Sequence, residues 1–241
     1  MTKKQFWTLF GVNLFLFVAM VITDVLYIVY GGLTIKSIAS SVFVLTSLVN
    51  LILMFIYKNT LNKAFMIVLF IGQVFAMLGD IFLEIHFVIG AALFAVGHVF
   101  YFASYCTLKK PRWADLIYIG IAILISAIVI FVSKIELGSM APLIIAYAFI
   151  ISCMLGKSAT LIANNKKTGI FIFVGSLMFY LSDMFLMFRL FGGLGKVGSV
   201  LCLSFYYPAE FILALSITIV GCLIKEKEKN KNKLDVSKQE N

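Results

Sequence analysis

The fold is decided by residues 65–85, FMIVLFIGQVFAMLGDIFLEI. This stretch is apolar almost throughout. As a helix with a rise of about 1.5 Å per residue it is about 30 Å long, the thickness of the hydrocarbon core of a bilayer. Two carboxylates lie within it, Asp80 well inside the stretch and Glu84 near its end. A charged side chain at the bilayer centre costs roughly 2.5–3.5 kcal/mol on insertion scales, so an intramembrane aspartate indicates a functional site.

A near-copy of the motif around Asp80 recurs in a second apolar stretch. Residues 78–83 read LGDIFL and residues 181–186 read LSDMFL, so Asp183 matches Asp80. The two expected helices are four spans apart and run in the same direction, the arrangement that a parallel duplication of four helices gives. We therefore predict that the two aspartates work as a pair.

The composition extends this reading to the whole chain. Of its 241 residues, 62% are hydrophobic and only 13% are charged. A soluble domain of this size does not need so much apolar surface, so we predict an all-α membrane protein, a bundle of eight transmembrane helices. The expected spans are Phe6–Tyr30, Ile35–Tyr57, Phe65–Ile85, Val88–Leu108, Leu116–Val132, Ala141–Ala163, Ile170–Phe191 and Gly198–Ile224.

The 20 lysines and arginines predict the orientation of this bundle. Most of them fall in segments that lie on the same side of the membrane as the N-terminus. Because lysine and arginine are enriched on the cytoplasmic side, we expect both termini to be cytoplasmic. The net charge of +9 then reflects topology and attraction to membrane lipid, not nucleic-acid binding. Residues 1–224 form the predicted membrane domain, and the Lys- and Glu-rich residues 225–241 a disordered cytoplasmic tail. A compact chain of this kind is typical of a bacterial plasma membrane.

Further polar residues cluster in the outer half of the expected spans or near the midplane. His98 and Tyr101 share a face of the fourth span at i and i+3. Residues 206–210 place two tyrosines and a glutamate together on the eighth span. Lys36 lies at the outer mouth, where it could meet a phosphate. In the inner half, we expect Lys157 to extend its ammonium to the interface.

Five blocks of sequence carry a resemblance to a known family, and they occur in the family's order. They are 79–83 (GDIFL), Gly90 with 94–101 (FAVGHVFY), Tyr147, 175–183 (GSLMFYLSD) and 206–216 (YYPAEFILALS). At these blocks the chain resembles the lysoplasmalogenase (YhhN-like) membrane family, and Lys36 resembles the lysine that opens the family's second span. Ser37 stands where a proline is common, and Glu210 stands where a glutamine is usual.

The resemblance implies an integral membrane hydrolase of the vinyl-ether bond of lysoplasmalogens. Such an enzyme releases a fatty aldehyde and a glycerophospho-base from a lysophospholipid, with no metal or other cofactor established as essential. The implied catalytic residues are Asp80 and Asp183. The implied pocket residues are Lys36, His98, Tyr101, Tyr147, Ser182, Tyr206, Tyr207 and Glu210. Asp24, Glu84 and Arg189 do not belong to the family's pattern, and the oligomeric state is not predicted.

The predicted chemistry requires two carboxyl groups with different protonation states. Protonation of the β-carbon of a vinyl ether gives an oxocarbenium ion, which water captures before the hemiacetal collapses to aldehyde and alcohol. Two carboxyl groups at low dielectric suit this reaction, because proximity keeps one protonated while its partner ionises. Such a pair titrates as a unit, so the sequence does not assign the acid and the base. His98, Tyr101, Tyr206 and Tyr207 would orient water and the ether oxygen.

Other readings of these residues remain open. The aspartates and His98 could be structural, and Lys36 and Arg189 could be interfacial anchors. A zinc hydrolase would have to use carboxylates, because His86 and His98 are the only histidines. An intramembrane aspartyl protease would need a glycine at position 77, where the chain has Met. The main alternative is a proton-coupled transporter or carrier, since ion pathways also use intramembrane acids.

Overall fold

The computed structural model describes residues 2–59, 62–133 and 135–239, with side chains described as far as Cys222. Within these residues the chain forms α1 (Lys3–Tyr30), α2 (Leu33–Ile56), α3 (Lys63–Ile85), α4 (Phe87–Leu108), α5 (Asp115–Val132), a 3-10 turn η1 (Gly138–Met140), α6 (Ala141–Asn164), α7 (Lys166–Phe191) and α8 (Gly195–Gln239). All eight α-helices are long and apolar enough to cross a membrane. The prediction of an all-helical protein with eight spans is confirmed.

The helices begin slightly before the apolar runs because polar residues continue them. At the start of α1, Thr2 and Gln5 form a capping box, in which each side chain bonds the backbone N–H of the other. At the start of α7, the helix includes Lys166 and Lys167. The predicted tail, residues 225–241, lies outside the residues whose side chains are described, so its disorder stays a prediction.

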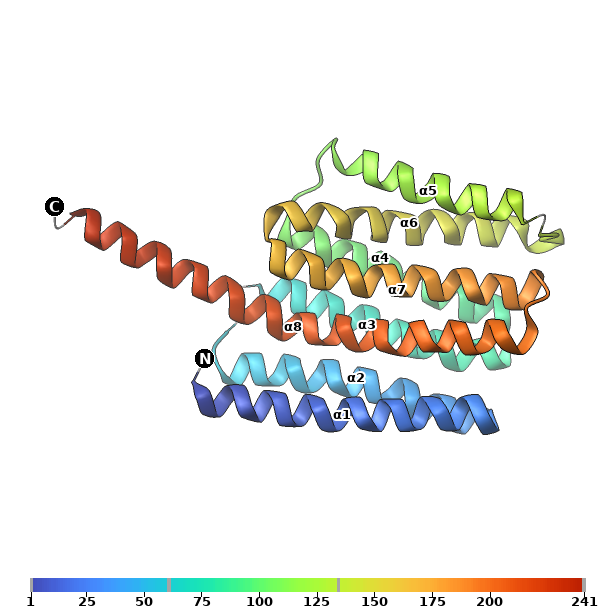
Figure 1. The fold of residues 1–241 in the computed structure, drawn as a ribbon, viewed down its shortest axis with the longest axis horizontal. Coiled ribbons are helices and arrows are strands. Elements are labelled where there is room, and N and C mark those ends of the chain that lie inside the picture. The colour runs from blue at the N-terminus through green and yellow to red at the C-terminus, as the bar shows by residue number, and fades with distance from the viewer. Residues whose placement is uncertain (1, 60–61, 134, 240–241) are drawn as a thin grey trace.

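Six of the helices form a closed ring. In order around the ring they are α2, α3, α4, α6, α7 and α8, and α8 packs back against α2. The most extensive contacts are between α3 and α4 and between α7 and α8. Outside the ring, α1 lies against α2 and α8, and α5 packs only against α6 among the described helices. Figure 1 shows α1 and α5 along opposite edges of the molecule.

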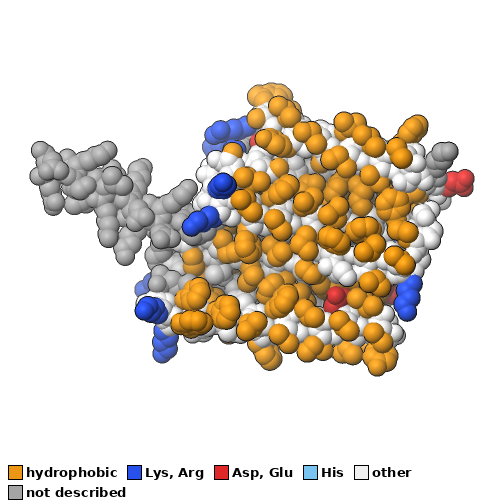
Figure 2. Space-filling model, in the orientation of Figure 1, with side chains coloured by type: hydrophobic (Ala, Val, Ile, Leu, Met, Phe, Trp, Pro, Cys, Tyr) orange, Lys and Arg blue, Asp and Glu red, His pale blue; other side chains and the backbone are white. Residues whose placement is uncertain are grey.

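Of the ring helices α8 is the most buried, and α5, outside the ring, is the least buried of all the spans. In the spanning window of α8, 61% of the residues are buried, against 17% in α5. Apolar side chains cover most of the face seen in Figure 2, with lysines and arginines near its ends. This distribution is the one expected of helices whose outer surfaces face lipid.

Glycines permit the close packing of α3 against α4. A Cβ atom on Gly90 would lie 2.4 Å from the backbone nitrogen of Leu83. One on Gly72 would lie 2.6 Å from the ring of Tyr101. Small residues of this kind let two helix backbones approach in a membrane. Because Gly72 has no side chain, the Tyr101 side chain has room to extend into the interior of the six-helix ring.

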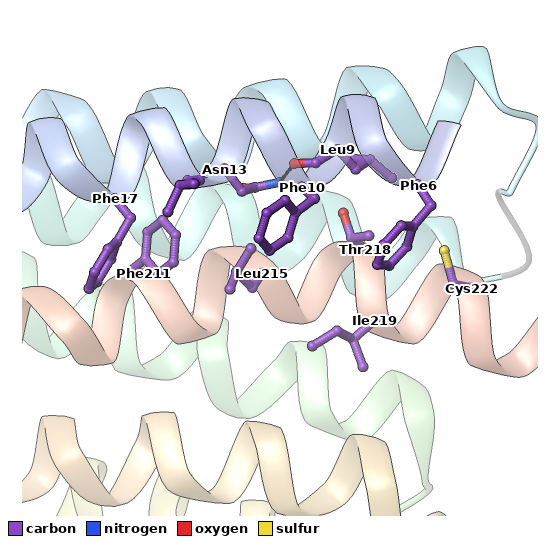
Figure 3. Close-up of a pocket in the computed structure, with 11 residues that line it drawn as sticks. Phe6, Leu9, Phe10, Asn13, Phe17, Phe211, Leu215, Thr218, Ile219 and Cys222 are labelled. Atoms are coloured by element: carbon purple, nitrogen blue, oxygen red, sulfur yellow. Dashed lines mark hydrogen bonds between the residues drawn. The ribbon is translucent and has the colours of Figure 1, made fainter. Parts of the chain in front are cut away.

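A groove of about 560 Å³ runs between α1 and α8. Figure 3 shows phenylalanines of α1 facing Phe211 and Leu215 of α8 across it, and Ile219 is also in its lining. Under the groove, Asn13 and Asn50 exchange hydrogen bonds of 3.1 and 2.7 Å. Thr218 also donates to Asn50, at 2.6 Å. The residues that line this groove include none of the ten predicted site residues.

We expect Gly90→Ala to destabilise the protein, because the new methyl group would overlap backbone atoms of α3. Overpacking typically costs about 1–3 kcal/mol. Gly120→Ala on α5 is the matched control, since a Cβ there would meet nothing within 4 Å. Thermal unfolding of both variants in detergent micelles measures the difference. Equal midpoints for the two variants would contradict the packing argument.

Candidate functional site

All ten predicted site residues lie on the six ring helices. They are Lys36 on α2, Asp80 on α3, His98 and Tyr101 on α4, Tyr147 on α6, Ser182 and Asp183 on α7, and Tyr206, Tyr207 and Glu210 on α8. Tyr147 and Asp183 are partly buried, and the other eight are buried. The ring therefore gathers residues from distant parts of the sequence into its interior.

The first group is the Asp80 cluster, which consists of Asp80, Ser40, Lys36, Glu84 and Tyr27. The Ser40 hydroxyl donates to Asp80 Oδ2 at 2.5 Å. Lys36 Nζ lies 3.8 Å from Asp80 Oδ1 and 3.1 Å from Glu84 Oε1. The Tyr27 hydroxyl donates to Glu84 at 2.5 Å. Three helices, α1, α2 and α3, are joined by this cluster.

Lys36 is a partner of carboxylates in this structure. Its side chain is 6% exposed, and its ammonium faces Asp80 and Glu84. The predicted contact with a phosphate stays a prediction. The sequence contained a signal for this cluster, because Lys36 and Ser40 on α2, and Asp80 and Glu84 on α3, are each separated by one helical turn.

The second group is the Asp183 cluster, which consists of Asp183, Tyr147 and His98. The Tyr147 hydroxyl donates to Asp183 Oδ2 at 2.6 Å. His98 Nε2 lies 2.9 Å from the Tyr147 hydroxyl and 3.3 Å from Asp183 Oδ2. Among the described residues, no lysine or arginine forms an ion pair with Asp183. Its carboxyl group therefore has a hydroxyl and an imidazole as neighbours, in contrast to Asp80.

The third group is the Glu210 cluster, which consists of Glu210, Tyr101 and Gln73. The Tyr101 hydroxyl lies 2.9 and 2.8 Å from the two carboxyl oxygens of Glu210. Gln73 Nε2 donates to Glu210 Oε2 at 3.0 Å and to the Glu210 backbone carbonyl at 2.8 Å. The hydroxyl of Tyr101 is thus bonded to Glu210 and not to either aspartate.

Aromatic rings lie next to both aspartate clusters. The Phe179 ring is 4.6 Å from the His98 ring and 5.2 Å from that of Tyr206, which lies beside Asp80. Asp80 and Asp183 make no hydrogen bond to each other and share no hydrogen-bonding partner among the described residues. The sequence predicts one pair of acids, and the structure places them in two separate clusters within one ring.

Two buried tyrosine hydroxyls lie next to the Asp80 cluster. They belong to Tyr206, beside Asp80, and to Tyr207, beside Ser40, and these residues are 3% and 0% exposed. Neither makes a hydrogen bond of good geometry among the described residues. A polar group that enters the ring near Asp80 would meet both hydroxyls. Ser182 is different, because its hydroxyl contacts Cys202 Sγ at 3.4 Å, between α7 and α8.

Asp183 and Tyr147 line two small cavities. One, of about 60 Å³, lies towards the end of the bundle at which α7 terminates, and Phe87 and Phe191 are in its wall. The other, of about 50 Å³, lies between α5, α6 and α7, and its wall includes Tyr180 and Met184. Apart from Asp183, Tyr147, Tyr180 and Ser126, the two linings are apolar. The Asp183 cluster is thus next to space that suits hydrocarbon.

A fourth polar group lies at the other end of the bundle. Lys157 is 0% exposed, and its ammonium lies 2.5 Å from Asp115 Oδ2. Asp115 also accepts from the backbone N–H of Arg112 at 3.1 Å. The Lys157 ammonium thus extends to the first residue of α5, where it meets a carboxylate instead of open solvent, and its position at the membrane interface stays a prediction. The sequence analysis missed Asp115, whose signal was its position as the first residue of an apolar run.

These observations define a class, a helical membrane protein with acidic clusters inside a six-helix ring. The sequence model of the YhhN family matches residues 39–217, which run from α2 into α8 and include the predicted site residues other than Lys36. The chain belongs to the YhhN family, which includes lysoplasmalogenases. The resemblance predicted from the motifs is confirmed. Neither the comparison with curated proteins nor that with solved structures gave a match.

We expect Asp115→Ala to destabilise the protein strongly, because it leaves the Lys157 ammonium buried without its carboxylate. Breaking a buried ion pair from one side typically costs about 3–5 kcal/mol. The double variant Asp115→Leu with Lys157→Met should recover much of that loss, since it removes both charges. Glu136→Ala, which removes an exposed carboxylate, is the control. Thermal unfolding of the four proteins tests this, and a fully stable Asp115→Ala would refute it.

Proposed function

We propose that this protein is a membrane-embedded hydrolase that cleaves the vinyl-ether bond of lysoplasmalogen-type lysophospholipids. The proposal rests on one observation above the others, the Asp183 cluster in the wall of apolar cavities inside a ring that also holds the Asp80 cluster. Membership of a family that includes lysoplasmalogenases supports it. The substrate is a lipid of the surrounding membrane, and both termini are cytoplasmic in a bacterial plasma membrane.

Asp183 is the general acid in this proposal. It borders the apolar cavities, where the hydrocarbon side of the substrate belongs, and no lysine or arginine among the described residues holds it as an anion. The Asp183 carboxyl group gives its proton to the β-carbon of the vinyl ether. The carbon–carbon double bond becomes a single bond, and the positive charge is shared by the α-carbon and the ether oxygen.

Asp80 is the carboxylate that stabilises this cation and activates water. The Lys36 ammonium and the Ser40 hydroxyl both face Asp80, and both interactions favour the anion. Asp80 takes a proton from water as its oxygen bonds to the α-carbon, which gives a hemiacetal. Asp80 then returns that proton to the ether oxygen as the carbon–oxygen bond breaks, and the hemiacetal hydroxyl gives its proton to Asp183. The products are a fatty aldehyde and a glycerophospho-base, and both carboxyl groups are restored.

Neighbouring residues position these groups. Tyr147 and His98 hold the Asp183 carboxyl group from two sides. The hydroxyls of Tyr206 and Tyr207 lie in the half of the ring near Asp80, where water and the glycerol part of the substrate belong. The Phe179 ring lies against the rings of His98 and Tyr206, and an aromatic face beside the reacting carbon would stabilise the developing cation as it does an ammonium.

Asp80→Asn and Asp183→Asn should each reduce aldehyde release from lysoplasmalogen by about 100-fold or more, because acid–base groups typically contribute about 10²–10⁴-fold. Purified protein is incubated with lysoplasmalogen and, separately, with an ester-linked lysophospholipid, and aldehyde and fatty acid are measured. The thermal unfolding midpoint confirms that each variant is folded. Turnover near the wild-type rate in either folded variant would refute the role of that aspartate. A wild-type protein that releases no aldehyde would favour the carrier.

Lys36→Met should lower kcat by about tenfold or more with little change in KM, because Asp80 loses a charge partner worth about 1.4 kcal/mol. A contact with the substrate phosphate instead predicts a higher KM with kcat preserved. Lys196→Met removes an exposed lysine near the start of α8 and is the control. Steady-state kinetics on lysoplasmalogen separate the two outcomes, and an increase confined to KM would contradict the contact with Asp80 as the role of Lys36.

A further inference from the structure

The geometry points to a lateral binding site for the alkenyl chain of the substrate, in the groove between α5 and α7, which leads past Met184 to Asp183. This inference rests on the proposed function and adds where the hydrocarbon lies. The substrate class that follows is a lipid with one long unbranched chain, held from the side of the bundle that faces the membrane interior.

The groove exists because only α6 packs closely along α5. Among the described helices the backbone of α5 lies close to that of α6 alone, and α7 reaches α5 through the long Tyr180 side chain, which bonds Ser126 and Ala122. The space left between α5 and α7 is a groove of about 350 Å³. On the α5 side, its lining includes Ile125 and Ile128, which are 46% and 50% exposed. In a membrane such side chains face lipid tails, so a lipid chain can enter the groove without crossing a polar surface.

The groove and the cavity of Asp183 meet at two residues. Tyr180 and Met184 are in the walls of both, and they lie on α7 on either side of Asp183. Tyr180 is fixed, because its hydroxyl lies 2.6 Å from the Ser126 hydroxyl and 3.1 Å from the Ala122 carbonyl oxygen. Met184 is an unbranched and flexible side chain of the kind that adapts to a ligand. Met184 is therefore the movable part of the constriction.

The volumes of the Asp183 cavity and of the groove indicate which part of the substrate lies in each. The cavity next to Asp183, at about 50 Å³, is the smaller of the two spaces and suits the few atoms of the reacting bond. The groove is several times larger and apolar. A vinyl ether next to Asp183 then leaves its chain in the groove, while the glycerol end extends towards Tyr206 and Asp80.

The α1–α8 groove shown in Figure 3 is the natural comparison. It is also apolar and faces the membrane, but neither aspartate lines it, and the amides beneath it are bonded to each other. A bulky residue there should leave the reaction unaffected. Ile219→Trp is therefore matched to Ile125→Trp, since each places an indole in one of the two grooves.

The test uses a long-chain lysoplasmalogen and a short-chain vinyl-ether analogue. Met184→Trp and Ile125→Trp should lower kcat/KM for the long chain by about tenfold, the loss expected when about two methylene groups are no longer buried. Ile125→Trp should stay within about twofold of wild type on the short analogue, and Ile219→Trp should match wild type on both. Ile125 is exposed, so its variant folds even where Met184→Trp does not. Equal losses on long and short substrates in Ile125→Trp, or a loss confined to Ile219→Trp, would overturn the inference.

A binding measurement separates this inference from the proposed reaction. Trp7 and Trp113 are first replaced by Phe, so that the introduced indole is the only one. A lysophospholipid with a brominated chain should then quench the indole fluorescence saturably in the Ile125→Trp protein, with competition by unbrominated lipid, and should give no saturable quenching in the Ile219→Trp protein. Saturable quenching without any aldehyde release would retain the chain site and reject the hydrolase. Aldehyde release without saturable quenching in the Ile125→Trp protein would retain the hydrolase and reject the chain site.

Discussion

The structure depends on one constraint: a polar side chain inside the apolar ring must find its partner on another helix. Backbone groups are satisfied within each helix, so the interactions between helices fall to side chains. Asp80 bonds to α2, Asp183 bonds to α4 and α6, and Glu210 bonds to α3 and α4. These bonds fix the rotation of each helix about its axis, which apolar packing alone leaves weakly determined. The groups that we assign to catalysis are therefore also groups that hold the ring in register.

The ring has the pattern that a duplicated four-helix unit would give. The contacts α1–α2, α2–α3 and α3–α4 recur as α5–α6, α6–α7 and α7–α8, and the contact of α2 with α8 recurs as that of α6 with α4. Asp80 and Asp183 occupy equivalent helices, but their partners differ: a lysine and a serine for one, a tyrosine and a histidine for the other. A repeated scaffold with unlike neighbours allows one carboxyl group to act as acid and the other as base.

The sequence predicts the elements of this fold well because their signals are local. A long apolar run specifies a spanning helix, and the start of α7 differs by only four residues, Lys166 against Ile170. Ordered motifs also specify the family. The partners of the polar groups are a different matter, because they depend on how helices pack side by side. The pairing of Lys157 with Asp115 and the bond from Tyr101 to Glu210 join segments that no local pattern connects. For the same reason the sequence does not predict that Asp80 and Asp183 have separate hydrogen-bonding partners, and their action as a pair stays a prediction.

The deep burial of α8 has a consequence for the biogenesis of the protein. A ribosome makes this helix after the other seven, yet it carries Glu210, the partner of Gln73 and Tyr101, and Thr218, a partner of Asn50. Until α8 inserts, these groups on the earlier helices lack their final partners in a medium where an unbonded polar atom is costly. The bundle without α8 is therefore an intermediate with unpaired polar groups, and the insertion of α8 supplies their partners.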